Sequence, residues 1–185
     1  MKRFIVILFL LISTMSFSQS SFELSAFGRT TTTIRSDMIY SGGVNFEWIP
    51  KSKHIGLNYS LRFGEDENGN FQFQCPMGII TGVLVMAALV EALDDLSGIG
   101  LFLGFVPEGL SYNVYFSDII TIAPYVNPLQ MYFSEDKVRP LLEIGAKLKM
   151  PIGTKFFSYF DFGVQSPYNY SRINTNVSLA LGWWF

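Results

Sequence analysis

The side chains best placed for chemistry are charged residues that recur on one face of segments with alternating polarity. Successive side chains of a β-strand point to opposite faces, so residues two apart share a face. Four acids and four bases fall on the polar face of these segments, and we expect them to line a common interior. They are Glu23, Arg29, Glu47, Arg62, Glu143, Lys147, Lys149 and Asp161.

Two kinds of chemistry are open to such a set. Buried charges must be paired, because leaving an ion unpaired away from water carries a large desolvation penalty. Equal numbers of acids and bases therefore predict an ion-pair network that fills the interior and holds it shut. The alternative is a narrow conductance path or a proton-coupled gate.

No catalytic, cofactor-binding or metal site is predicted. The only histidine, His54, has no nucleophile nearby in the sequence, so we expect a structural or surface role in place of a general base. The only cysteine, Cys75, has no partner for an internal disulfide and is expected to be inert. The acidic run 65–70 lacks the spaced ligands and closing glutamate of a calcium loop, which predicts a solvated loop.

The elements that must position these side chains are strands. Polarity alternates with a period of two along most of the chain, most clearly over residues 173–185. Turn positions then divide the chain into eight strands, an even number. They are expected at residues 22–34, 38–49, 53–64, 108–117, 119–133, 138–150, 155–165 and 172–185.

The connections alternate in length, as an up-and-down barrel in a membrane requires. Tight turns are expected at residues 50–53, 117–118 and 151–154, all at the end that carries both termini. The longer connections, including residues 65–107, fall at the opposite end. Residues 119–133 contain Pro124 and Pro128, which cannot donate to a ladder, so we expect a bulge there or a strand that leaves the barrel early.

The composition favours a membrane over water as the surroundings. Charged residues make up 15% of the chain, below the ~25% typical of soluble domains, and the chain has 18 Phe, 9 Tyr and 3 Trp. A soluble sandwich also alternates, but its apolar face carries fewer large aromatics. The apolar faces place aromatic residues near the tight turns, where a membrane girdle is expected. These girdle residues are Trp48, Phe116, Phe156 and Trp183, with Phe185 at the terminus.

Residues 1–18 are expected to be a cleaved secretory signal peptide, with Lys2 and Arg3 before an apolar run and small residues at the cleavage site. A retained anchor is the alternative, but the run is much shorter than the ~20 residues that span a bilayer. The net charge of −2 leaves no basic surplus for nucleic acid.

The segment between the third and fourth expected strands is unusually apolar. Pro76 is placed to open a helix, and Glu91 is the only charge over residues 77–93. Such a helix cannot stand in open water. We expect residues 76–107 to fold against the rim of the barrel or to dip into the outer leaflet. The alternative is a transmembrane helix of an inner-membrane protein.

The signal peptide, the eight alternating segments and the last strand ending in Phe185 together resemble the small eight-stranded outer-membrane β-barrels of the OmpA/OmpX-like group. The resemblance implies an antiparallel up-and-down transmembrane β-barrel over residues 19–185, in the outer membrane of a Gram-negative cell. It also implies that Phe185 is an assembly signal read by the barrel-assembly machinery. The insert 65–107 departs from the group.

We therefore expect an all-β outer-membrane barrel with a helical insert between strands 3 and 4, no cofactor and no enzyme activity. Its role would be structural or in binding, with a plugged polar lumen. Its partners would be outer-membrane lipid, and a protein or hydrophobic ligand at the external loops. The alternative is a lipid-facing enzyme or a transport helper that uses residues 76–107 to capture acyl chains.

Overall fold

The computed structural model describes residues 21–33, 38–50, 54–66, 68–79, 106–117, 119–135, 137–168 and 173–185. The expected signal peptide and most of the expected helical insert lie outside these residues. Residues 77–79, which follow Pro76, are helical. Within the described ranges, no helix is long and apolar enough to cross a bilayer.

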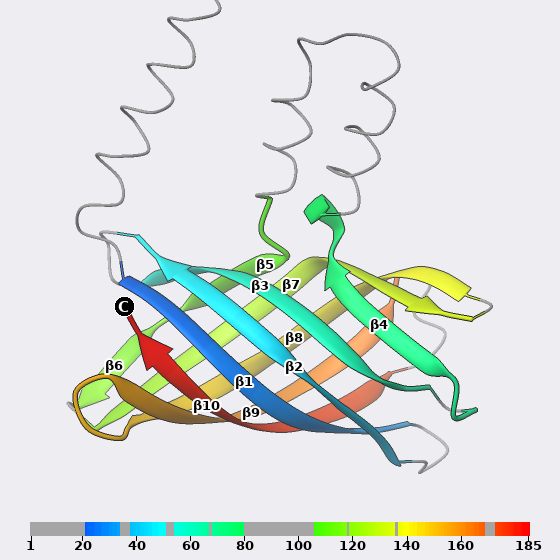
Figure 1. Cartoon of the computed structure of the whole chain (residues 1–185). Coiled ribbons are helices and arrows are strands. Elements are labelled where there is room, and N and C mark those ends of the chain that lie inside the picture. Colours follow the sequence, from blue (N-terminus) through cyan, green and yellow to red (C-terminus); the bar gives the residue numbers. More distant parts are fainter. Residues whose placement is uncertain are drawn as a thin grey trace, which may run out of the picture.

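Ten strands form one closed antiparallel sheet, shown in Figure 1. Since β1 pairs with both β2 and β10, and β2 pairs with β3, the wall has no free edge. Three short strands share one position between β3 and β7, so the barrel has eight positions. The strands are β1 (Ser21–Thr32), β2 (Met38–Ile49), β3 (Ile55–Glu65), β4 (Phe71–Pro76), β5 (Gly109–Tyr112), β6 (Val114–Ser117), β7 (Ile120–Ser134), β8 (Lys137–Pro151), β9 (Phe156–Pro167) and β10 (Asn174–Trp184).

The two ends of the barrel differ in their connections. The terminal end, as we name it, carries the start of β1, the end of β10 and the turns after β2, β6 and β8. At the turn after β8, the Ile152 amide donates to the Phe156 carbonyl at 2.7 Å, and Gly153 has a φ of +90°. The distal end carries the β3–β4 hairpin, where the Asp66 carboxylate accepts the backbone N–H groups of Asn68 and Asn70.

The fourth strand corrects the expected topology. Residues 65–107 were expected to lie outside the wall, but Phe71–Pro76 form β4, which pairs with the distal halves of β3 and β7. The chain leaves the wall after Pro76 and returns at Glu108 to form β5 and β6 in the terminal half. The insert therefore interrupts the fourth strand and does not join strands 3 and 4. Alternation was present in β4, but only for six residues between a turn and a proline.

The proline-containing strand stays in the wall and carries a bulge, so the first of the two expectations is confirmed. Strand β7 pairs with β8 on both sides of a register shift between Asn127 and Gln130, which encloses Pro128 and Leu129. This shift lies opposite the interruption between β4 and β5, since Pro76 faces Gln130 and Leu110 faces Val126. The two irregularities compensate each other, because the bulged residues lie where the neighbouring strand is broken.

The outer face of the wall is apolar and the inner face is polar. Large apolar side chains such as Leu181, Phe162 and Val44 are exposed on the outside. An apolar band this continuous requires lipid around it. Inside, small residues make room for large ones: a Cβ added at Gly145 or Gly163 would lie 2.6 or 2.8 Å from the Tyr125 hydroxyl. A narrow barrel is thus filled by its own side chains.

Candidate functional site

The barrel lumen contains all eight charged residues that alternation placed on the inner face. Each of the eight is buried, with at most 6% of its surface exposed. They form two clusters, one in the terminal half of the lumen and one in its middle. The expected girdle residues Phe116, Phe156 and Trp183 are exposed on the outside, as is Phe185, whereas Trp48 is half-buried.

The terminal cluster is built around Lys149. Its Nζ lies 2.6 Å from the Glu23 carboxylate and 2.9 Å from the Glu47 carboxylate, and it also donates to the Asn113 side chain at 3.0 Å. Lys147 adds a second cation at 3.3 Å from Glu47. Two carboxylates therefore face two ammonium groups. Glu47 fits here because residue 56 is glycine, and a Cβ at that position would overlap the Glu47 carboxylate.

The middle cluster is built around Glu143. Its carboxylate lies 2.7 Å from the Arg29 guanidinium and 2.7 Å from the Arg62 guanidinium. Asp161 lies 3.1 Å from Arg29. The Tyr125 hydroxyl is within hydrogen-bond distance of both Glu143, at 3.0 Å, and Asp161, at 2.9 Å. The tyrosine lies between these two carboxylates.

Glu108 is a ninth lumen charge that alternation did not predict. Its carboxylate is buried, accepts hydrogen bonds from Ser60 at 2.9 Å and Asn127 at 3.1 Å, and lies 4.0 Å from Arg62. Glu108 has the same parity as Leu110 and Tyr112, which face outward. Only the irregular backbone next to the insert turns its side chain inward, so a strand pattern could not reveal it.

One path of hydrogen bonds and ion pairs links the two ends of the lumen, with the 4.0 Å contact between Glu108 and Arg62 as its longest step. Uncharged side chains join the two clusters: Asn58 accepts from Lys147 at 3.3 Å and donates to Asn127 at 3.2 Å, and Asn127 donates to Glu108. At the distal end, Arg62 and Gln165 both donate to the Gln74 amide oxygen, at 3.3 and 3.2 Å. These amides also escaped the sequence analysis, since neutral polar residues on an inner face carry no charge signal.

An aromatic cluster lies in the terminal end of the lumen. Phe157 is buried and stacks on Trp184 with ring centroids 4.8 Å apart, and the Trp184 indole N–H donates to Glu23 at 3.0 Å. Phe27 and Tyr159 complete this apolar cluster. The charged and polar side chains of the lumen therefore pack against an aromatic cluster at this end.

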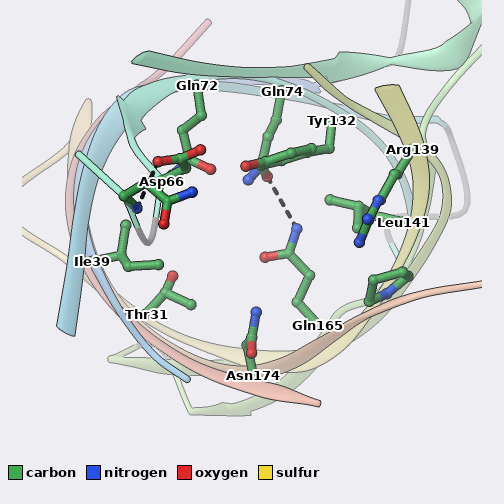
Figure 2. A pocket seen from close by; sticks show the side chains of 12 residues that line it. Thr31, Ile39, Asp66, Gln72, Gln74, Tyr132, Arg139, Leu141, Gln165 and Asn174 are labelled. Carbon is green, nitrogen blue, oxygen red and sulfur yellow. Dashed lines mark hydrogen bonds between the residues drawn. The ribbon is translucent and has the colours of Figure 1, made fainter. Parts of the chain in front are cut away.

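The distal end opens into a small cavity of about 100 Å³, shown in Figure 2. Its lining comes from β1, β2, the β3–β4 hairpin, β7, β8, β9 and β10. Three glutamines, Gln72, Gln74 and Gln165, are each more than nine-tenths buried in its wall. Arg139 lies at its edge, opposite Tyr132 in the β7–β8 pairing. We call this cavity the distal vestibule.

The remaining residues singled out in the sequence lie apart from these clusters. His54 is exposed at the terminal end, where it stacks on Tyr112 at 5.6 Å and its Nδ1 lies 3.0 Å from the Asn113 carbonyl oxygen. Cys75 is buried in β4. Among the described residues, no group of His, Cys, Asp and Glu side chains is arranged to hold a metal ion.

No protein-family model and no curated protein matches the chain. Among solved structures, the N-terminal β-barrel domain of Pseudomonas aeruginosa OprF is similar over 89% of this chain and 97% of that one, with 14% identity and a TM-score of 0.52. The attachment invasion locus protein Ail of Yersinia pestis (90% and 97% covered, 8% identity, TM-score 0.49) and Neisserial surface protein A (90% and 97%, 4%, 0.49) are also similar. With its closed antiparallel wall of eight positions, the chain has the fold of the small eight-stranded outer-membrane β-barrels.

Proposed function

We propose that this protein is a non-conducting, non-enzymatic barrel of the Gram-negative outer membrane that presents its distal end to a partner. One observation carries the proposal, namely the path of ion pairs and hydrogen bonds from Trp184 and Glu23 at the terminal end to Gln74 and Gln165 at the distal end. A lumen filled in this way serves as a rigid support better than as a passage.

Electrostatics supports a closed lumen. Each of the four lumen cations contacts a carboxylate, and the pairs cross between strands that are not neighbours. A hydrated ion could pass only by displacing these pairs, and an unpaired buried charge costs about 3–5 kcal/mol. Passage of an ion would break several of these ion pairs at once. The network therefore acts as a fixed plug.

The position of His54 supports a non-enzymatic role. Its ring is held by the Asn113 carbonyl, by stacking on Tyr112 and by an edge-on contact with Tyr115, at the end opposite the vestibule. A general base must reach the proton that it removes. Here the ring instead helps to join the start of β3 to the residues between β5 and β6.

The proposal is tested by recording currents from the purified barrel in planar lipid bilayers. We expect no steady conductance from the wild-type protein. Steady porin-sized currents would overturn the plug. Localisation is tested separately by membrane fractionation with a gel shift on heating, and recovery in the inner membrane would overturn the outer-membrane assignment. Unchanged lipid A in mass spectra after expression would agree with the absence of lipid-modifying activity.

A second candidate is a transport helper that binds acyl chains through the insert. One observation favours it: the chain leaves the wall after Pro76, beside lipid-facing residues such as Leu110 and Val126, and not at the rim. Most of residues 76–107 lie outside the described part. Deletion of 77–107 that abolishes binding of a fluorescent fatty acid, while the gel shift on heating persists, would favour this candidate.

A further inference from the structure

The distal vestibule contains polar groups that have no hydrogen-bond partner among the described residues. Gln72 is buried in its wall, yet its amide makes no hydrogen bond with the described residues. The buried Asn174 Oδ1 is also unpartnered. Leaving a buried polar atom unsatisfied costs about 1–3 kcal/mol, so the Asn174 oxygen would be stabilised by water or by a ligand. In the lumen below, by contrast, the charged groups are paired.

Arg139 is the second unusual feature of the vestibule. No carboxylate of the described residues lies within ion-pair distance of it, whereas Arg29, Arg62, Lys147 and Lys149 each have at least one. Figure 2 shows its guanidinium beside the cavity, on the same side as Leu141. A guanidinium in this position can bind a carboxylate through two parallel hydrogen bonds.

The geometry of the amides indicates the shape of the ligand. Gln72 and Gln74 approach from β4, Gln165 from β9 and Asn174 from β10, so they surround the cavity from several sides. An amide both donates and accepts, as a hydroxyl does. Groups placed around a compact space match hydroxyls around a sugar ring better than the linear array of polar groups on an extended peptide.

The apolar surface and the size of the distal vestibule also fit a sugar. The rings or side chains of Ile39, Leu141, Pro167 and Tyr132 also line the cavity, and they can contact the C–H face of a sugar. The volume of about 100 Å³ is several times the ~10–15 Å³ that holds one water. Small-ligand sites typically combine such apolar lining with a few placed polar groups.

We propose that the distal vestibule binds a single sugar residue that carries a carboxylate, with Arg139 on the carboxylate and the amides on the hydroxyls. This inference deepens the proposed function, because it names the chemistry of the presented end and rests on a lumen closed beneath it. The sugar could be free or could end an oligosaccharide. The same contacts serve both.

The test measures binding of galacturonate to the folded barrel in detergent micelles by calorimetry or saturation-transfer NMR. We expect saturable binding in the millimolar range or better. Arg139→Gln should weaken galacturonate about tenfold and leave neutral galactose unchanged. Gln72→Leu should weaken both sugars without lowering stability, since that amide has no protein partner to lose. Lys155→Gln, which removes an exposed charge at the terminal end, is the matched control and should change nothing.

Trigalacturonate distinguishes the two sources. Tighter binding of the trimer indicates the end of a chain, and preference for the monomer indicates the free sugar; both support the site. Equal affinity of wild type and Arg139→Gln for galacturonate would overturn the proposal. So would absence of saturable binding, or binding of N-acetylglycylglycine in its place. Bilayer currents report on the plug independently, so failure of the sugar site and failure of the closed lumen give different results.

Discussion

Arg62 of β3 and Glu143 of β8 are joined by a 2.7 Å ion pair that crosses the lumen between strands that are not hydrogen-bonded neighbours. Arg29 reaches the same carboxylate from β1. Three separate parts of the wall are thus tied through one acid. Because water cannot compensate a charge left behind there, we expect the lumen to be sensitive to substitution of this carboxylate.

Glu143→Gln should destabilise the barrel strongly. The substitution leaves Arg29 and Arg62 without the charge that they share, and breaking a buried pair in this way costs about 3–5 kcal/mol. The free energy of unfolding can be measured by urea titration of the barrel in lipid vesicles, followed by tryptophan fluorescence. Glu65→Gln, at an exposed carboxylate in the same barrel, is the control and should stay within about 0.5 kcal/mol of wild type. Equal effects of the two substitutions would contradict the network.

Glu108 should tolerate glutamine but not alanine. Glutamine keeps an oxygen for Ser60 and Asn127 and removes one negative charge from a cluster in which three carboxylates face two guanidinium groups. Alanine leaves those donors unsatisfied, at a cost of about 1–3 kcal/mol. Amide hydrogen exchange at Leu129, which donates to the Glu108 carbonyl, should accelerate in the alanine variant alone. Similar exchange rates at Leu129 in both variants would mean that the Glu108 side chain does not stabilise the break between β4 and β5.

Gly182→Ala should destabilise the terminal end through a steric clash. A Cβ at position 182 would overlap the Phe157 ring, which is held against Trp184 and Tyr159 and cannot move freely. Overpacking of this kind costs about 1–3 kcal/mol. Gly28→Ala is the control, because a Cβ there meets nothing within 4 Å. Adding Phe157→Leu to the Gly182→Ala variant should recover part of the loss in a thermal gel-shift assay, and no recovery would argue against the clash.

Phe185→Ala should reduce assembly in cells more than it reduces stability. Phe185 is exposed and stacks on Trp183 at 5.2 Å, so its removal costs little packing inside the barrel. If the terminal aromatic is an assembly signal, the amount of heat-shifted protein in the outer membrane should fall severalfold. Phe162→Ala removes an equally exposed aromatic from the middle of β9 and serves as the control. Equal yields from the two variants would show that the terminus has no special role.

Much of the wall could be predicted from alternation, because lipid outside and a packed interior inside impose opposite polarity on successive residues. Strand β2 has the predicted bounds, 38–49, and β1, β7 and β8 differ from prediction by two residues or fewer. Charge at inward positions located Glu143 and Lys149 for the same reason. Pairing partners such as Tyr125 were not found, since a hydroxyl among apolar residues carries no distinctive pattern.

The fourth strand shows where local pattern fails. Its terminal half, β5 and β6, lies within the predicted strand 108–117, whereas its distal half, β4, has only six residues and is shorter than the length by which a spanning strand is recognised. Residues 77–79 after Pro76 are helical, as its position predicts, but Pro76 also ends β4. What joins the halves is pairing with β3 and β7, a long-range relationship that no window of sequence contains.

The register of the interrupted strand has a consequence for how the chain is organised. Arg62 faces Gln74 above the break and Asn58 faces Gly109 below it, so β3 leaves room for only one residue between Pro76 and Gly109. Glu108 occupies that place: its amide donates to Asn58, and its carbonyl accepts from Leu129. The wall is thus complete without residues 77–107. A variant in which Pro76 is joined directly to Glu108 should still fold as a complete barrel. A different segment inserted between the same two residues should leave the surrounding strands unchanged.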